Sequence, residues 1–108
     1  PKPADADWIE ARASETERMG LKPLWEGYAG VPSYPRATDG STRRSDQVRS
    51  PALAGYLYSW LAAERDAAMI VEIGTAFGIS GMYWLSGLKC NGHGRLLTFE
   101  PNVVWADI

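Results

Sequence analysis

Residues 69–100 read MIVEIGTAFGISGMYWLSGLKCNGHGRLLTFE, and the predicted fold is organised around them. Residues 69–73 form a short apolar run with several β-branched side chains, which favours a strand buried on both faces. A glycine-spaced turn and a helical pattern follow, and a second turn then leads into the apolar run 95–99. Four residues recur at the i, i+3, i+4 and i+7 positions of one helical face: Gly81, Trp84, Leu85 and Leu88. The order predicts a strand, a helix and a parallel strand.

The turn after the first strand carries Gly74 and Gly78. Because glycine has no side chain, such a turn brings backbone N–H groups at a helix N-terminus close to a ligand above the strand ends. Ser80 can accept from the free N–H groups of that helix end, and Gly81 would let the helix approach the strand closely. Glu100 ends the second strand 22 residues after Gly78, where a carboxylate can accept from both hydroxyls of a ribose. Together these signals predict a site for an adenosine-containing ligand.

Two segments of this unit carry a family resemblance. Residues 72–80 (EIGTAFGIS) and 94–102 (GRLLTFEPN) resemble the first two motifs of class I S-adenosylmethionine-dependent methyltransferases. The E-x-G-x-x-x-G-x-S form is similar to that of small-molecule O-methyltransferases of the catechol O-methyltransferase type. The resemblance covers about residues 50–108. It implies an α/β fold, in which N-terminal helices precede the first β-α-β unit of a doubly wound, Rossmann-like methyltransferase sheet that is truncated in this chain.

The resemblance also implies roles for individual residues. Residues 74–78, the glycine turn, would line the methionine and ribose part of S-adenosylmethionine. Ser80 would hydrogen-bond the cofactor's carboxylate, and Glu100 would bind the ribose diol. Glu72 would orient the glycine turn near the methionine end, and residues 101–102 would flank the adenosine. The cofactor-binding positions are therefore Glu72, Gly74, Thr75, Ala76, Phe77, Gly78, Ser80, Glu100, Pro101 and Asn102.

A dinucleotide site is the main alternative at this turn. The pattern is Gly74-x-x-x-Gly78-x-x-Gly81, so the second close glycine of G-x-G-x-x-G is missing, and no Walker A lysine follows. A fragment of a nicotinamide-dependent oxidoreductase is thus less favoured than a methyltransferase. Two glycines in such a turn also occur in α/β proteins without a ligand, and a Phe77 packed beneath the turn is an equal alternative to direct contact with the cofactor.

The residues that would activate a methyl acceptor are not identified by any motif. His93, the single histidine, lies in a turn at the other end of the strands from the expected ligand, which disfavours a role as catalytic base. The sequence has no His or acid cluster with metal-ligand spacing. In the resembling family the ligands of a divalent metal belong to later strands, which this chain does not contain. We therefore expect the 108-residue chain to be inactive by itself.

Residues 1–49 are expected to form a separate N-terminal part. Residues 7–19 begin with an acid and precede a glycine, which predicts a short helix. Residues 21–45 combine prolines, glycines and aromatic residues, which excludes long regular structure. Long loops in compact domains are usually functional or mobile. The interpretations are a lid over the ligand, a dimer contact, or a segment packed on the protein surface.

A second helix is predicted at the start of the cofactor-binding part, residues 50–108. Ser50 and Pro51 form an N-cap and first-turn pair. By resemblance, Arg49 and Ser50 are weaker candidates for contact with the methionine end of the cofactor. The residues of the expected buried stripe are Leu53, Leu57, Trp60 and Leu61.

Composition restricts the class of protein. The chain has 108 residues, 45% of them apolar, and a net charge of −2, which is typical of one soluble globular domain. Its basic residues are scattered, so we expect no nucleic-acid partner. Cys90 is the single cysteine, and no apolar run is long enough for a membrane span or a signal peptide. A cytoplasmic location is the simplest expectation.

The spacing of the strands predicts that the sheet is incomplete. Ile70 and Arg95 are 25 residues apart, so a sheet of six or seven strands would need about 100 to 125 more residues. Asn102 resembles the N-cap of a further helix, and the sequence stops at Ile108. Two parallel strands leave two open edges. The expected partners are a small-molecule acceptor and either a second copy of the chain or a missing C-terminal part. A non-catalytic association module that binds another chain is a further alternative.

Overall fold

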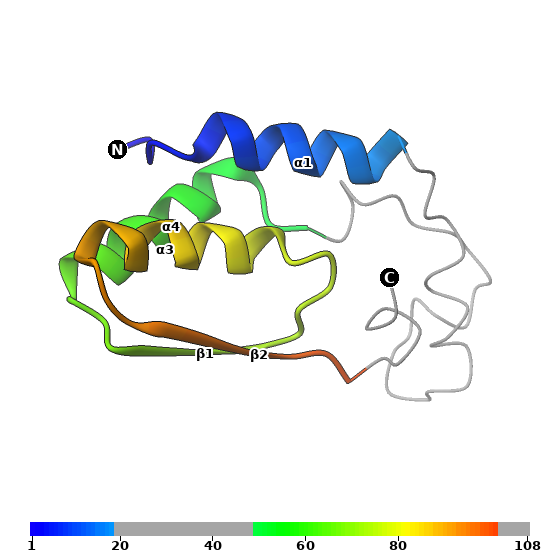
Figure 1. The fold of residues 1–108 in the computed structure, drawn as a ribbon. Helices are drawn as coiled ribbons and strands as arrows, with labels where there is room; N and C mark the ends of the chain where they lie inside the picture. The colour runs from blue at the N-terminus through cyan, green and yellow to red at the C-terminus, as the bar shows by residue number, and fades with distance from the viewer. Residues whose placement is uncertain (19–48, 102–108) are drawn as a thin grey trace.

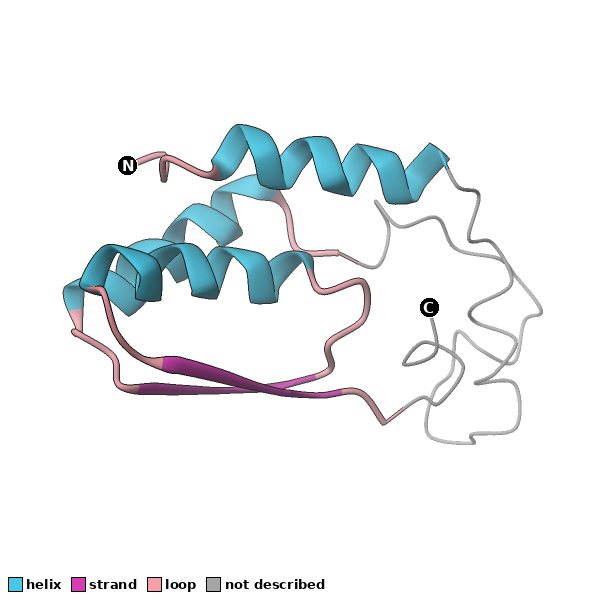
Figure 2. Cartoon of the chain, viewed as in Figure 1, coloured by secondary structure: helices cyan, strands magenta, loops and turns pink. Residues whose placement is uncertain are grey.

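The computed structural model describes residues 1–18 and 49–101 of the chain (Figure 1). Within these residues, three helices and a two-stranded parallel sheet make a mixed α/β arrangement, in agreement with the predicted class. The helices lie on one side of the sheet, with α1 on the side of α3 and α4 that faces away from the strands (Figures 1 and 2). The elements are α1 (Ala6–Arg18), α3 (Ala52–Glu64), β1 (Met69–Ile73), α4 (Ile79–Asn91) and β2 (Arg95–Phe99).

The sequence predictions for the two strands are confirmed. Both have the predicted bounds and pair in parallel, with Met69 opposite Arg95 and Ile73 opposite Phe99. Because the strands end together, the turn that follows β1 and the residue that follows β2 lie at the same edge of the sheet. The sheet beyond these two strands stays a prediction, and residues 21–45 lie outside the described part of the chain.

The predicted burial of β1 on both faces is wrong for the described structure. Alternate residues differ in burial along β1, and Ile73 is 76% exposed. The covered face carries Glu72 and Leu96, which lie beneath Gly81 of α4. On the other face, no described element covers the apolar side chains, because all three described helices lie on the opposite side. These exposed residues, the open sheet face, are Met69, Val71, Ile73, Leu97 and Phe99.

Helices α3 and α4 pack through small residues instead of the predicted stripe. Leu53 is 78% exposed, Leu57 and Trp60 are exposed as well, and Leu61 is half-buried. The buried residues of α3 are Gly55, Ser59 and Ala62. A Cβ atom at Gly87 would collide with the Ser59 carbonyl oxygen and the Ala62 side chain, so the two helices approach too closely for large side chains at this contact. The large apolar side chains are consequently displaced to the outer side of α3.

The ends of the helices confirm one prediction and correct two. Helix α4 ends at Asn91, and Gly92 follows in the left-handed conformation, as its sequence signal predicts. However, α4 begins after Gly78 without a side-chain cap, so Ser80 is not its N-cap. Helix α3 likewise begins after Pro51 without a side-chain cap. The hydroxyl of Ser50 instead lies 3.5 Å from that of Tyr58, so a tertiary contact replaces the expected cap.

The predicted apolar face of α4 is only partly buried. Gly81 and Leu88 are buried, Trp84 is half-buried and stacks on Tyr58 with ring centroids 4.7 Å apart, and Leu85 is exposed. Leu85 lines a cavity between α1 and α4. Helix α4 therefore uses more than one face for packing.

Helix α1 spans Ala6–Arg18, within a residue of the predicted bounds 7–19, and packs on α4 through a compact apolar cluster. The cluster consists of Ala6, Ile9, Ala13, Ile79 and Tyr83. Each of these side chains is nearly inaccessible to solvent. The cluster holds the first turn of α4, and therefore the glycine turn before it, against the N-terminal helix.

A hydrogen-bonded network borders this cluster. Arg49 donates to both carboxylate oxygens of Glu10, from Nη1 at 3.0 Å and from Nη2 at 2.7 Å. Tyr83 donates its hydroxyl to Glu10 Oε1 at 2.6 Å. The Arg49 hydrogen bonds, aided by that of Tyr83, lower the pKa of Glu10. Burial and the Glu10 carboxylate raise the pKa of Tyr83, which therefore stays a hydrogen-bond donor. The network therefore connects three parts of the chain: α1, α4 and the segment that precedes α3.

Candidate functional site

The glycine turn, residues 74–78, is bound to the end of β2. The N–H groups of Gly74 and Thr75 donate to the carbonyl oxygen of Phe99 at 2.7 and 3.3 Å. The N–H of Ala76 donates to Glu100 Oε2 at 2.7 Å. Two segments that are separated by a whole helix in the sequence thus meet at the carboxyl edge of the sheet. Open α/β sheets bind their ligands at this edge.

Glycine is required in this turn by backbone conformation. The φ angles of Gly74 and Gly78 are +90° and +76°, and a Cβ atom at either position would meet no atom within 4 Å. A side chain would therefore fit in space but not in the preferred backbone regions of an L-residue. Ala76 adopts φ +47°, which costs about 1 kcal/mol. That conformation directs its N–H at Glu100, so the strain is offset by a charge-assisted hydrogen bond.

Glu72 is the centre of a second set of contacts. Ser80 donates its hydroxyl to Glu72 Oε1 at 2.6 Å, and Thr98 donates to Oε2 at 2.7 Å. The Thr75 and Thr98 hydroxyl oxygens are 2.5 Å apart. A Cβ atom at Gly81 would lie 3.3 Å from Glu72 Oε2, so the carboxylate sits under the first turn of α4. The positive end of the helix dipole favours a negative charge there.

Direct hydrogen bonds join six of the ten predicted cofactor-binding residues in three pairs. The pairs are Glu72 with Ser80, Thr75 with Gly78, and Ala76 with Glu100. The side chain of Phe77 packs against the apolar cluster beneath the turn, in line with the alternative interpretation of that residue. Pro101 is exposed at the end of the described segment, and Asn102 lies outside the described residues. The cofactor contacts of all ten stay predictions.

The sequence predictions missed one residue of the site, and one of their weaker candidates contacts other residues instead. Thr98 joins Glu72 to the glycine turn, although no motif indicated it. The signal that could have found it is the pairing of the strands, which places Thr98 opposite Glu72. Arg49, a weaker candidate for the methionine end, has its guanidinium group bound to Glu10 and to the backbone of Ser50.

A metal centre is not formed by the residues that the structure describes. Among residues 1–18 and 49–101, no group of three or more His, Cys, Asp or Glu side chains could hold a metal ion. His93 instead contacts Asp66, with Nε2 2.8 Å from Oδ1, at the opposite end of the strands from the glycine turn. None of the described helices is long and apolar enough to cross a membrane.

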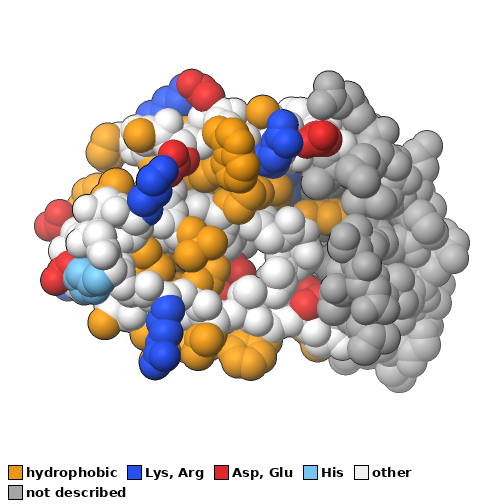
Figure 3. All heavy atoms as spheres, in the orientation of Figure 1, with side chains coloured by type: hydrophobic (Ala, Val, Ile, Leu, Met, Phe, Trp, Pro, Cys, Tyr) orange, Lys and Arg blue, Asp and Glu red, His pale blue; other side chains and the backbone are white. Residues whose placement is uncertain are grey.

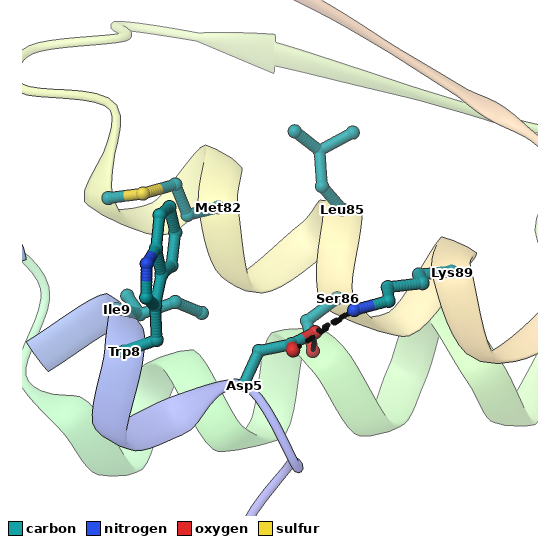
Figure 4. A pocket seen from close by; sticks show the side chains of 7 residues that line it. All are labelled: Asp5, Trp8, Ile9, Met82, Leu85, Ser86 and Lys89. Atoms are coloured by element: carbon teal, nitrogen blue, oxygen red, sulfur yellow. Dashed lines mark hydrogen bonds and ion pairs between the residues drawn. The ribbon is translucent and has the colours of Figure 1, made fainter.

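A separate cavity of about 450 Å³ lies between α1 and α4 (Figure 4). Trp8 and Met82 lie side by side at one end, and Lys89 and Ser86 both contact the Asp5 carboxylate at the other. The hydrogen bond from Lys89, together with that from Ser86, lowers the pKa of Asp5. Apolar side chains gather on this face of the molecule (Figure 3). The lining contains none of the ten predicted cofactor-binding residues: it consists of Asp5, Trp8, Ile9, Met82, Leu85, Ser86 and Lys89.

Comparisons of the chain with protein-family models, with curated proteins and with solved structures found no match. A functional assignment therefore depends on the chemistry of the carboxyl edge of the sheet.

Proposed function

We propose that this chain is the cofactor-binding N-terminal portion of an S-adenosylmethionine-dependent methyltransferase that acts on an oxygen of a small molecule. One observation carries the proposal. The glycine turn after β1 and Glu100 after β2 lie within one hydrogen bond of each other, from Ala76 N to Glu100 Oε2. A ligand above this edge would meet the N-terminal turn of α4 and a carboxylate at the end of the adjacent parallel strand. This is the pair of features that a nucleoside with a polar tail requires.

The charge of the site supports the choice of cofactor. Both hydrogen-bond donors to Glu72 within the described residues are neutral hydroxyls, from Ser80 and Thr98, so no described lysine or arginine neutralises this carboxylate. S-adenosylmethionine carries a positive sulfonium and a positive ammonium group, whereas a dinucleotide carries a negative pyrophosphate. A carboxylate without a cationic partner among the described residues attracts the first and repels the second. The electrostatics therefore favour a methyltransferase over a nicotinamide-dependent oxidoreductase.

The described residues would contribute positioning to the reaction. The bound cofactor would supply a methyl group, which passes from sulfur to the acceptor oxygen while the sulfur keeps the bonding electron pair. The glycine turn and Glu100 would hold the two ends of the cofactor, and aligned reactants gain most of their rate from orientation. We assign no base for the acceptor proton among the described residues of this edge: Glu72 accepts from two hydroxyls, Glu100 accepts from Ala76 N–H, and His93 is at the far end of the strands.

The test is calorimetric titration of the chain with S-adenosylhomocysteine and, separately, with NAD. We expect binding of S-adenosylhomocysteine, weakened about tenfold or more by Glu100→Gln, because glutamine keeps an acceptor for Ala76 N–H but loses the charge-assisted bonds to the ribose. Glu64→Gln is the matched control, since Glu64 is exposed at the end of α3 and should leave affinity unchanged. Binding of NAD without S-adenosylhomocysteine would overturn the proposal.

The open sheet face favours a second candidate function, that of an association module. Five large apolar side chains are exposed together on β1 and β2, and exposed apolar patches commonly mark contact surfaces. Both strands also have an unpaired edge within the described residues. Sedimentation at several concentrations distinguishes this role, since a monomer at every concentration would count against a module that binds its own copies.

A further inference from the structure

We propose that Thr98 is a positioning residue for the cofactor site and acts through Glu72 and Thr75. The inference rests on the proposed function, because it concerns the methionine end of the same site. Thr98 belongs to β2, and its register partner on β1 is Glu72. Its hydroxyl therefore crosses from one strand to the other, and it contacts both the carboxylate of Glu72 and the first side chain of the glycine turn.

The direction of each hydrogen bond follows from counting protons. An ionised carboxylate has only acceptor sites, so Thr98 must donate its single hydroxyl proton to Glu72 Oε2. The 2.5 Å contact between Thr98 and Thr75 can then be made only by the Thr75 proton. Ser80 likewise donates to Glu72 Oε1. Thr98 thus accepts a hydrogen bond from Thr75 and donates one to Glu72, so it links the glycine turn to the Glu72 carboxylate.

This arrangement immobilises the Glu72 carboxylate. One oxygen is fixed by Ser80 of α4 and the other by Thr98 of β2, beneath the first turn of the helix. Without Thr98, Oε2 loses its donor, and the Thr75 hydroxyl loses its acceptor within the described residues. The side chains of Glu72 and Thr75 would then both sample other rotamers. A hydroxyl at position 98 therefore orders the acceptors at the methionine end before the ligand arrives.

The same proton count defines what the methionine end recognises. Because Ser80 donates its hydroxyl proton in the hydrogen bond to Glu72, it presents only lone pairs to a ligand, next to a carboxylate that also only accepts. Such a set of acceptors binds an ammonium group, whereas a ligand carboxylate would require Ser80 to leave Glu72. The expected determinant at this end is therefore the ammonium group of the amino-acid tail, held by acceptors that Thr98 keeps in place. This inference replaces the contact between Ser80 and the cofactor's carboxylate that the family resemblance implies.

The experiment compares two ligands and two variants by calorimetry. S-adenosylhomocysteine has the amino-acid tail, and 5′-methylthioadenosine has the same nucleoside and thioether sulfur without it. Thr98→Val removes the hydroxyl but keeps a β-branched side chain at an exposed strand position, and Thr98→Ser restores a hydroxyl. We expect Thr98→Val to weaken S-adenosylhomocysteine about tenfold and methylthioadenosine less than about threefold. Thr98→Ser should bind both ligands within about threefold of the original chain.

The possible outcomes distinguish failure of the inference about Thr98 from failure of the proposed function. If Thr98→Val weakens both ligands equally, Thr98 has only a general structural role and the inference is wrong. If it binds S-adenosylhomocysteine as tightly as the original chain does, Thr98 has no role in binding and the inference is again wrong, while the proposed function stands. If the original chain binds neither ligand, the proposed function itself fails and the inference fails with it. Circular dichroism of each variant confirms that the compared proteins are equally folded.

Discussion

Replacing Tyr83 by phenylalanine removes one hydroxyl from the contact between α1 and α4 and leaves the ring in place. The Tyr83 side chain is 1% exposed, and its hydroxyl donates to Glu10 Oε1 at 2.6 Å. Its ring meets that of Tyr56 edge to face, with centroids 5.9 Å apart, and phenylalanine can keep this packing. The substitution therefore isolates the hydrogen bond from the apolar contacts.

The size of the effect follows from the partners that Glu10 retains. A hydrogen bond to a charged group contributes about 1.5–3 kcal/mol. After the substitution Glu10 Oε1 still accepts from Arg49 Nη2 at 2.7 Å. The Glu10 side chain is also 32% exposed, so water replaces part of the lost interaction. We therefore expect Tyr83→Phe to lower the free energy of unfolding by about 1–2 kcal/mol, below the middle of that range.

The effect should depend on pH in the acidic range. The Arg49 and Tyr83 hydrogen bonds hold the pKa of Glu10 below its ordinary value of 4.5 in the folded chain. Stability from a lowered carboxyl pKa is complete above the unfolded-state pKa and is lost as pH falls through the folded-state pKa. The difference between the original chain and Tyr83→Phe should therefore be constant near neutral pH and shrink as the pH falls below about 4.5.

Urea unfolding followed by circular dichroism measures this prediction. Tyr56→Phe is the matched control, because the Tyr56 hydroxyl makes no hydrogen bond within the described residues and its removal should cost less than about 0.5 kcal/mol. The slope of free energy against urea should not change, since the folded surface is the same. Equal midpoints for Tyr83→Phe and the original chain would refute the assigned role of the network.

Two further substitutions test the packing of the helices and the open sheet face. Gly87→Ala gains about 1 kcal/mol of helix propensity but forces a methyl group onto the Ser59 carbonyl and the Ala62 side chain, so we expect a net loss of about 1–2 kcal/mol in urea unfolding. A rise in the midpoint would contradict the close approach of α3 and α4. Val71→Thr keeps the β-branch at a side chain that is exposed, so its free energy of unfolding should change by less than about 0.5 kcal/mol. Its sedimentation should show less self-association, and a loss of stability above about 2 kcal/mol would instead show that this face is covered.

Local signals predicted the strands and the end of α4, because these features depend on the residues of one short segment and not on its packing partners. The apolar run of β1 favours a strand, and the glycine after Asn91 favours a helix end, whatever packs around them. Both features appear as predicted. The stripe of α3 was wrong for the opposite reason. Large apolar residues such as Leu53 were expected at the contact, but the depth of a helix contact is set by both helices, and Gly87 on α4 lets the small face of α3 approach instead.

The two serine caps failed for a related reason. A hydroxyl that follows a strand or precedes a proline is a good N-cap when no stronger partner is near. Ser80 has a carboxylate within 2.6 Å, and Ser50 lies beside the Tyr58 hydroxyl. Competition between a cap and a tertiary partner depends on how elements pack, so the sequence identified Ser80 as a polar residue of the site but not its partner.

Thr98 shows how far sequence reasoning about a site can reach. The glycine turn is contiguous, so its residues come together in any fold that contains it. The contact of Thr98 with Glu72 depends instead on the register of β1 against β2, and a slip by one residue would turn Thr98 to the open sheet face. That register begins where the Arg95 N–H donates to the Ala68 carbonyl at 3.1 Å, far from the site. The residues of the glycine turn can therefore be predicted from one contiguous motif, whereas the place of Thr98 opposite Glu72 depends on how two separate strands pair.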